Sequence, residues 1–130
     1  MFRPFILAIT ALSVFSSVSQ AADRVAIVFD GSGSMWGQIE GRTKIEIARD
    51  AMSGVLGNLP GDLELGLFAY GHREKGNCSD IELIVPPGAG TAAAIRQATD
   101  GITPKGKTPL SAAVRKAAET LRFTEDKATV

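Results

Sequence analysis

Short apolar runs alternate along the chain with stretches of helical spacing, a pattern typical of α/β proteins. The first run covers residues 25–29, and its five apolar residues lead directly into Asp30. Two further runs cover residues 63–70 and 80–85. A run this short and apolar predicts a strand buried on both faces, as in parallel sheets. We therefore predict that residues 25–29 form the central strand of a sheet.

Three segments have the spacing of amphipathic helices. The first follows Thr43 and ends near Gly57, the second is capped by Thr91, and the third opens with Thr108 as N-cap and Pro109 as first helical residue. Charged residues of the first helix, Arg49 among them, are expected in solvent. The expected buried faces are Ile45, Ala48, Met52, Val55 and Leu59; then Ile95 and Ala98; then Leu110, Ala113, Val114, Ala117 and Leu121.

The connection between the second and third runs is only nine residues long, residues 71–79. Because a helical crossover needs more chain than this, we predict that the two strands pair antiparallel. Pro86-Pro87-Gly88 should end the later strand, which suits the edge of a sheet. The predicted fold class is α/β, a three-layer open sheet that is mostly parallel and has one antiparallel edge strand.

Residues 1–21 have the features of a signal peptide. Arg3 supplies a positive charge, an apolar stretch follows at residues 5–15, and small residues precede a cleavage point after Ala21. The apolar stretch is shorter than the roughly 20 residues that cross a bilayer. We therefore expect an exported protein, periplasmic or extracellular, with no stable membrane insertion after cleavage and one domain from residue 22.

The composition is that of a globular protein, with 45% hydrophobic and 22% charged residues. The formal net charge is +0, so we expect no nucleic-acid partner. His72 is the one histidine of the sequence, which excludes a zinc cluster or triad built on several histidines. It is expected at the far end of another strand, away from the serines that follow Asp30.

Those serines, Ser32 and Ser34, form with Asp30 a candidate cation site. Asp30 ends the predicted central strand, where open α/β sheets place their ligands. The intervening Gly31 and Gly33 should let the loop curl, so that both hydroxyls turn toward the carboxylate. One carboxylate and two hydroxyls suit a hard cation such as Mg²⁺. The alternative is that these are ordinary turn and capping residues.

Two phosphate-binding motifs are set aside. The glycines at residues 31, 33 and 37 follow a strand as a dinucleotide motif does, but Asp30 would face the pyrophosphate. Residues 101–108 match G-x-x-x-x-G-K-[ST]. A helix is expected before that segment instead of a strand, and Pro104 removes one N–H from the phosphate cradle.

The sequence Asp30-Gly31-Ser32-Gly33-Ser34-Met35 after an apolar strand resembles the metal-ion-dependent adhesion site of von Willebrand factor type A domains. The resemblance covers residues 24–130, about the first two thirds of such a domain. It implies that Thr108 from a later loop joins Asp30, Ser32 and Ser34 as a ligand. It also implies a second aspartate after the next core strand, so we expect the last strands and that residue to be missing after Val130.

The function implied by the resemblance is binding of another protein that depends on a divalent metal. A carboxylate of the partner would complete the coordination of Mg²⁺, or of Mn²⁺ or Ca²⁺, and no catalysis is expected. Two alternatives remain open. One is a Mg²⁺-dependent hydrolase of phosphate esters. The other is an envelope assembly or sensor module with a vestigial metal site.

Two further side chains attract attention. Cys78 is a lone cysteine in a chain expected to be exported, and we expect it to form a disulfide with a cysteine in sequence after Val130. Trp36 follows the metal loop and either contacts a partner or packs as a structural aromatic.

Overall fold

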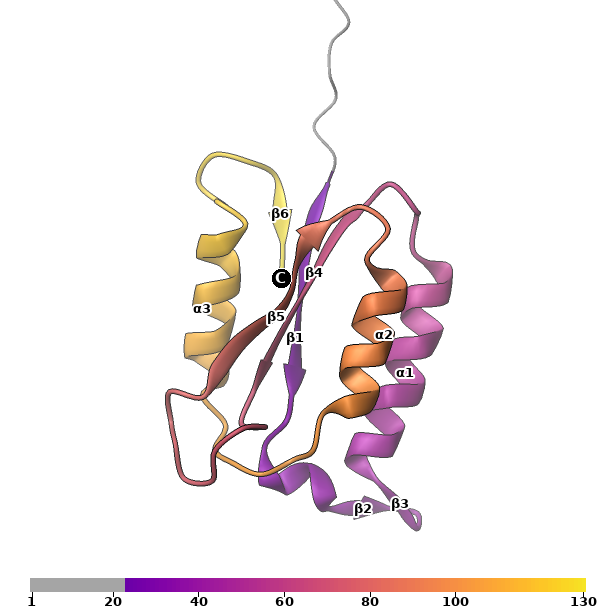
Figure 1. Ribbon diagram of the computed structural model, residues 1–130, viewed down its shortest axis with the longest axis vertical. Coiled ribbons are helices and arrows are strands. Elements are labelled where there is room, and N and C mark those ends of the chain that lie inside the picture. Colours follow the sequence, from indigo (N-terminus) through magenta and orange to yellow (C-terminus); the bar gives the residue numbers. More distant parts are fainter. Residues whose placement is uncertain (1–22) are drawn as a thin grey trace, which may run out of the picture.

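The computed structural model describes residues 23–130, so the predicted signal peptide lies outside the described residues. Figure 1 shows one sheet with helices on both faces. The elements in chain order are β1 (Arg24–Asp30), the 3₁₀ turn η1 (Gly33–Trp36), β2 (Gln38–Ile39), β3 (Arg42–Thr43), α1 (Lys44–Asn58), β4 (Glu64–Tyr70), β5 (Ile81–Gly88), α2 (Ala92–Gly101), α3 (Leu110–Thr120) and β6 (Ala128–Thr129).

The main sheet has the order β5-β4-β1-β6. β1 pairs in parallel with β4 along its whole length and with β6 at Arg24 and Val25, whereas β5 pairs antiparallel with β4 at the edge. α1 and α2 cover one face and α3 covers the other (Figure 1). The predicted α/β class, the three layers, the mostly parallel sheet and the antiparallel edge strand are therefore confirmed.

Each face of the sheet has its own hydrophobic core. Phe29, Leu65 and Leu67 pack with α1 and α2, and Ile95 of α2 is fully buried there as predicted. On the other face, Ala26 and Phe68 pack against α3. Apolar side chains on both faces explain the continuous apolar runs in the sequence.

The sequence predicts that β5 ends at its prolines. The strand instead continues through them to Gly88. The register of the β4–β5 pair shifts between Leu65 and Phe68, so that extra residues of β5 are accommodated in the ladder. An edge strand needs N–H donors on one side alone, and a shifted register is where prolines are tolerated. The prediction that β5 lies at an edge is confirmed.

The buried faces of two helices differ from the predicted ones. In α1 the core contains Leu56, while Val55 is 51% exposed. In α3, Leu110 and Val114 are exposed, and Ala113, Ala117 and Leu121 are buried. α1 packs against α2 as well as the sheet, which turns its buried face, and the alanines of α3 allow a close approach that leaves the larger side chains at its flank.

The helix starts also differ in part. α1 follows Thr43 as predicted, and Thr43 caps it in a capping box with Glu46. The hydroxyl of Thr91 does not cap α2 but donates to the carbonyls of Leu65, at 2.7 Å, and Gly88, at 3.1 Å. α3 begins one residue later than predicted, at Leu110, so that Pro109 and not Thr108 is its N-cap residue.

Arg49 is not in free solvent, contrary to the prediction. Its Nε donates to the carbonyl of Thr99 at 3.2 Å, and its Nη2 donates to the carbonyl of Ile102 at 2.7 Å. These carbonyls lie at the C-terminal end of α2, where backbone acceptors lack intrahelical donors. A single side chain of α1 thus holds the end of α2 and the start of the loop that follows.

We predict that Arg49→Ala lowers the free energy of unfolding by about 1–3 kcal/mol, because two carbonyls lose a charged donor. Arg96→Ala is the matched control, since Arg96 reaches across the same helix pair to the carbonyl of Ser53 at 3.5 Å. It should change stability by less than about 0.5 kcal/mol. Urea unfolding measures both values, and equal losses would contradict the role of Arg49.

Candidate metal site

The candidate site lies where β1 and β4 end at the same edge of the sheet. Asp30, the last residue of β1, pairs with Tyr70, the last residue of β4. A third loop, residues 102–109, crosses the same edge on its way from α2 to α3 (Figure 1). Parallel pairing thus brings loops from three distant parts of the sequence together.

Backbone hydrogen bonds join these three loops. The N–H of Gly31 donates to the carbonyl of Tyr70 at 2.8 Å, and the N–H of Gly33 donates to the carbonyl of Gly106 at 3.0 Å. The N–H of Gly106 in turn donates to the carbonyl of Gly71 at 2.7 Å. The loop that carries Asp30, Ser32 and Ser34 is therefore held on both sides.

The structure brings Asp30, Ser32 and Ser34 together. The backbone N–H of Ser32 donates to Oδ1 of Asp30 at 2.8 Å, and the Oγ atoms of Ser32 and Ser34 lie 3.0 Å apart. Ser32 is 1% exposed, whereas Ser34 is exposed. The oxygens thus lead from the protein interior to its surface.

This donor set fits a hard cation. Neighbouring ligands of an octahedral Mg²⁺ at about 2.0–2.1 Å lie about 3 Å from each other, which equals the 3.0 Å between the two serine oxygens. Both hydroxyl protons can rotate away from a cation, because hydroxyl groups turn freely about the C–O bond. Asp30, Ser32 and Ser34 are therefore the residues that would hold a metal at this edge.

Thr108 lies in the third loop, but its hydroxyl forms no hydrogen bond with Asp30, Ser32 or Ser34 within residues 23–130. It is exposed, and its carbonyl accepts from the N–H of Leu110 at 2.9 Å. The segment G-x-x-x-x-G-K-[ST] that ends at Thr108 follows helix α2, as expected for a loop that does not bind phosphate. The loop is placed beside the site, and the role of Thr108 as a ligand stays a prediction.

Tyr70 borders the site on the β4 side and was not identified from the sequence. It is 3% exposed. Burial raises the pKa of the Tyr70 phenol far above its ordinary value, and the neighbouring Asp30 carboxylate raises it further. The phenol is therefore neutral and presents a hydroxyl proton to the carboxylate. The continuous apolar run of β4 contains no signal that singles out this residue.

The glycines of the metal loop are needed for a reason other than the predicted one. Neither Gly31 nor Gly33 has a positive φ. Instead, a Cβ on Gly31 would lie 2.7 Å from Cβ of His72 and 2.7 Å from the carbonyl oxygen of Tyr70. The close approach of the β4 loop, not the curl of the metal loop, excludes a side chain at this position.

Gly71 is constrained twice. Its φ is +68°, and a Cβ would lie 2.3 Å from the carbonyl oxygen of Lys107 and 3.0 Å from Cα of Ser32. We predict that Gly71→Ala lowers the free energy of unfolding by about 2–4 kcal/mol, from the left-handed backbone and the clash together.

Gly76→Ala is the control for that substitution. Gly76 has a φ of +84° and open space around it, so it tests the backbone cost alone. It should cost about 1 kcal/mol. Thermal or urea unfolding separates the two effects, and equal losses would show that the contact between the loops contributes nothing.

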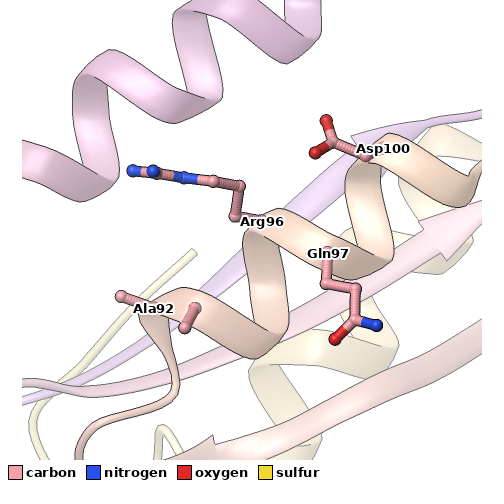
Figure 2. Close-up of a pocket in the computed structure, with 5 residues that line it drawn as sticks. Ala92, Arg96, Gln97 and Asp100 are labelled. Atoms are coloured by element: carbon pink, nitrogen blue, oxygen red, sulfur yellow. The ribbon is translucent and has the colours of Figure 1, made fainter.

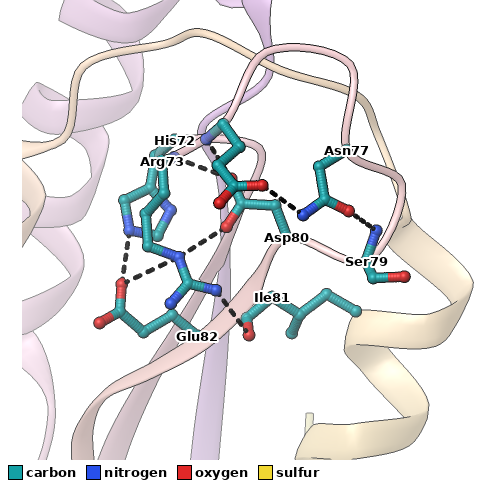
Figure 3. Close-up of polar contacts among 8 residues, drawn as sticks. His72, Arg73, Asn77, Ser79, Asp80, Ile81 and Glu82 are labelled. Atoms are coloured by element: carbon teal, nitrogen blue, oxygen red, sulfur yellow. Dashed lines mark hydrogen bonds and ion pairs between the residues drawn. The ribbon is translucent and has the colours of Figure 1, made fainter.

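A polar network organises the loop between β4 and β5 (Figure 3). Asp80, 1% exposed, accepts from the N–H of Arg73 at 2.8 Å, from Nε of Arg73 at 2.7 Å and from the N–H of Glu74 at 3.1 Å. Asn77 continues the network through Glu74, at 2.7 Å. Sequence analysis missed this cluster because charged residues in a loop are usually solvated.

Burial opposes the ionisation of Asp80, but the hydrogen bonds from Arg73 and from the N–H of Glu74 outweigh it, so the pKa of Asp80 lies below its ordinary value of 3.8. The ionised group therefore stabilises the fold above that value, and this contribution is lost as the pH falls through the lowered pKa.

We predict that Asp80→Asn lowers the free energy of unfolding at pH 7 by about 1.5–3 kcal/mol and that the difference from wild type shrinks below about pH 3.8. Urea unfolding from pH 7 to pH 2 measures this. Asp62→Asn, at an exposed aspartate between α1 and β4, is the control. A difference that stays constant with pH would contradict an ionised Asp80.

The sequence predicts that His72 is distant from the metal loop, and this is wrong. His72 follows β4 at the same edge of the sheet as Asp30. Its Nε2 is 2.8 Å from Oε2 of Glu82 on β5 (Figure 3). Its Nδ1 is buried and has no partner within residues 23–130. The Nε2 atom of the ring is thus engaged with β5 and not with the serines.

Two hollows on the surface of residues 23–130 contain no converging polar groups. One, of about 410 Å³, lies along α2, and Figure 2 shows Arg96, Gln97 and Asp100 pointing away from the helix in different directions. Another, of about 370 Å³, lies between β1 and α1 and is lined mainly by apolar side chains. Within residues 23–130, no three His, Cys, Asp or Glu side chains are grouped to hold a metal, so the candidate site relies on hydroxyl oxygens around one carboxylate.

Trp36 is both attached to the protein and exposed to solvent. Its indole Nε1 donates to the carbonyl of Pro104 at 2.9 Å, which attaches it to the third loop. The side chain is nevertheless 52% exposed. Cys78, in the β4–β5 loop, is also exposed, and its disulfide stays a prediction.

Comparison with known proteins identifies the family of this fold. The family model of the von Willebrand factor type A domain matches residues 8–130, from within the predicted signal peptide to Val130. The chain belongs to the von Willebrand factor type A domain family. The resemblance stated from the Asp-x-Ser-x-Ser sequence is confirmed, and domains of this family are in general protein-interaction modules and not enzymes.

One curated relative is uncharacterized protein YwmD of Bacillus subtilis (strain 168), 31% identical over 107 residues, or 77% of this chain and 48% of YwmD. Two solved structures share the fold. An uncharacterized membrane spanning protein from Vibrio fischeri is 18% identical, with a TM-score of 0.62 over 80% of this chain and 52% of that one. An aerotolerance-related membrane protein from Bacteroides fragilis is 17% identical, with a TM-score of 0.60 over 76% of this chain and 46% of that one.

This von Willebrand factor type A domain spans about half the length of these relatives. Both structural relatives are described as membrane proteins. In the part of the chain from residue 23 onward, no helix is long and apolar enough to cross a bilayer.

Proposed function

We propose that this domain binds another protein through a divalent cation held by Asp30, Ser32 and Ser34, with Thr108 as a further ligand. An acidic side chain of the partner completes the coordination, and the protein acts in the periplasm or outside the cell. The observation that carries the proposal is the 3.0 Å separation of the two serine hydroxyls next to the Asp30 carboxylate.

The charges of the site favour an acidic partner. Asp30 is the one carboxylate among the proposed ligands, so a divalent cation there, preferably Mg²⁺, would retain positive charge and attract a carboxylate. The buried Ser32 anchors the inner side of the site, and the exposed Ser34 leaves the outer side open. The hydrogen bonds from the β4 loop and the third loop hold the loop in place before a partner arrives.

The position of His72 argues against the alternative of phosphate-ester hydrolysis. Its Nε2 is engaged with Glu82 on β5, so this nitrogen is not free to act as a general base for the serines. A turnover assay with generic phosphate esters and Mg²⁺ tests this directly, and we expect no activity.

We predict that Asp30→Asn reduces Mg²⁺ affinity at least a hundredfold, because it removes the charge while an oxygen remains to accept from the N–H of Ser32. Ser32→Ala and Thr108→Ala should each weaken binding about tenfold, since each removes one neutral ligand. Isothermal titration with Mg²⁺ measures these affinities.

Asp62→Asn serves as the matched control for Asp30→Asn, because Asp62 is an exposed aspartate in the turn before β4 and away from the metal loop. Its Mg²⁺ affinity should equal that of wild type. Equal affinities for wild type and Asp30→Asn would instead assign the chain to the alternative with a vestigial site.

A further inference from the structure

Trp36 stands beside the candidate site as a rigid and exposed aromatic side chain. Its indole N–H is bound to the carbonyl of Pro104, yet the side chain is 52% exposed. A tryptophan held in one orientation loses little conformational freedom when a partner packs on it, which is why such residues often anchor interfaces. Ile39, in the β2–β3 hairpin three residues later, is 51% exposed as well.

Three lysines lie in the segments that adjoin Trp36, at the start of α1 and in the third loop. Lys44 extends over Gly37, which is the residue after Trp36. The Nζ atom of Lys44 lies 3.7 Å from the point where a side chain on Gly37 would begin. Lys105 donates its backbone N–H to the carbonyl of Gly31 at 3.1 Å, and Lys107 follows two residues later in the same loop. All three side chains are exposed.

The charges of these lysines are not neutralised within the described part of the chain. None of the ion pairs among residues 23–130 involves them. The arginines of the same edge differ, because Arg42 pairs with Asp50 and Arg73 pairs with Asp80. The basic side chains left over at this edge are thus Lys44, Lys75, Lys105 and Lys107, of which all but Lys75 lie in the segments next to Trp36 and the metal loop.

The edge as a whole is more basic than the rest of the molecule. Residues 30–44, 71–80 and 103–109 contain six basic and four acidic residues, although the formal net charge of the chain is +0. A divalent cation at Asp30 would add further positive charge. Such a surface attracts a negatively charged partner and speeds its association.

We propose that the surface formed by Trp36, Ile39, Lys44, Lys105 and Lys107 recognises an acidic protein segment in which an apolar side chain stands next to the metal-binding carboxylate. The apolar side chain packs on Trp36 and Ile39, and neighbouring carboxylates lie near the lysines. The metal-bound carboxylate rests on the proposed function, while the apolar and lysine contacts are independent of it.

Three short peptides of equal length test this. One contains a leucine between two aspartates, the second has serine in place of the leucine, and the third has asparagines in place of the aspartates. Trp36 is the single tryptophan of the chain, so its emission reports on this surface directly. With Mg²⁺ present, the leucine–aspartate peptide should shift the emission of Trp36 to the blue. It should bind at least fivefold more tightly than the serine peptide. The asparagine peptide should show no detectable binding.

Variants are compared by the fluorescence anisotropy of dye-labelled peptides. Trp36→Ala should abolish the preference for leucine over serine. Lys105→Glu and Lys107→Glu should each weaken the leucine–aspartate peptide fivefold or more and reduce the dependence of its affinity on salt. Lys116→Glu is the matched control, because Lys116 is exposed on α3 and away from this surface, and it should bind as wild type does.

Several outcomes would overturn the inference. They are undetectable binding of the leucine–aspartate peptide, a leucine preference that survives Trp36→Ala, or equal effects of Lys116→Glu and Lys105→Glu. Tighter binding of polyphosphate than of the peptide, with competition between them, would replace the protein segment by a phosphate polyanion.

The metal separates this inference from the proposed function. Binding that needs Mg²⁺ and Asp30 but ignores Trp36 and the lysines would keep the proposed function and overturn the inference. Binding that survives a chelator and Asp30→Asn, yet falls with Trp36→Ala and Lys105→Glu, would support the surface and reject the metal.

Discussion

The close packing of three loops around Gly71 is the constraint on which the candidate site depends. The carbonyl of Gly71 accepts from the N–H of Gly106 at 2.7 Å and from the N–H of Lys105 at 3.2 Å, and its own N–H donates to the carbonyl of Asp80 at 3.0 Å. A Cβ on Gly71 would clash with the carbonyl oxygen of Lys107 and lie 3.0 Å from Cα of Ser32, so no side chain fits there. The loop after β4 therefore positions both the metal loop and the loop that carries Thr108.

The rest of the fold supports this contact from both sides. The parallel register of β1 and β4 ends both strands at the same level, so that Asp30 and Tyr70 become neighbours. The buried carboxylate of Asp80 fixes the backbone of Arg73 and Glu74, which follow Gly71. Because these interactions are distributed over several elements, the site is a property of the domain and not of the Asp-x-Ser-x-Ser sequence alone.

Features that depend on neighbouring residues were predictable from the sequence. The apolar runs predict β1, β4 and most of β5, because burial leaves few polar positions in a strand. The convergence of Asp30, Ser32 and Ser34 was also predictable, since a single glycine separates each of them from the next in one loop. The capping box of Thr43 and Glu46 is equally local.

Features that depend on tertiary packing were not predictable. Arg49 and Thr91 look like ordinary helix residues, and what determines their roles is the presence of carbonyls from other elements within reach. Val55 and Leu56 are both apolar, and the position of α2 decides which one is buried. The burial of Asp80 likewise requires Arg73 and the backbone of the same loop, which no periodicity reveals.

In the proposed function, a rigid base would hold the cation and an exposed rim would select the partner. Ser32 is 1% exposed and its loop is held by backbone hydrogen bonds, so the inner oxygens need little reorganisation when a cation binds. Ser34, Trp36 and the lysines are exposed, so they are free to contact a partner. In the proposed function, substitutions at the rim should therefore change which protein binds without altering the geometry of the inner oxygens. Substitutions around Gly71 should change both the geometry of these oxygens and the binding of the partner.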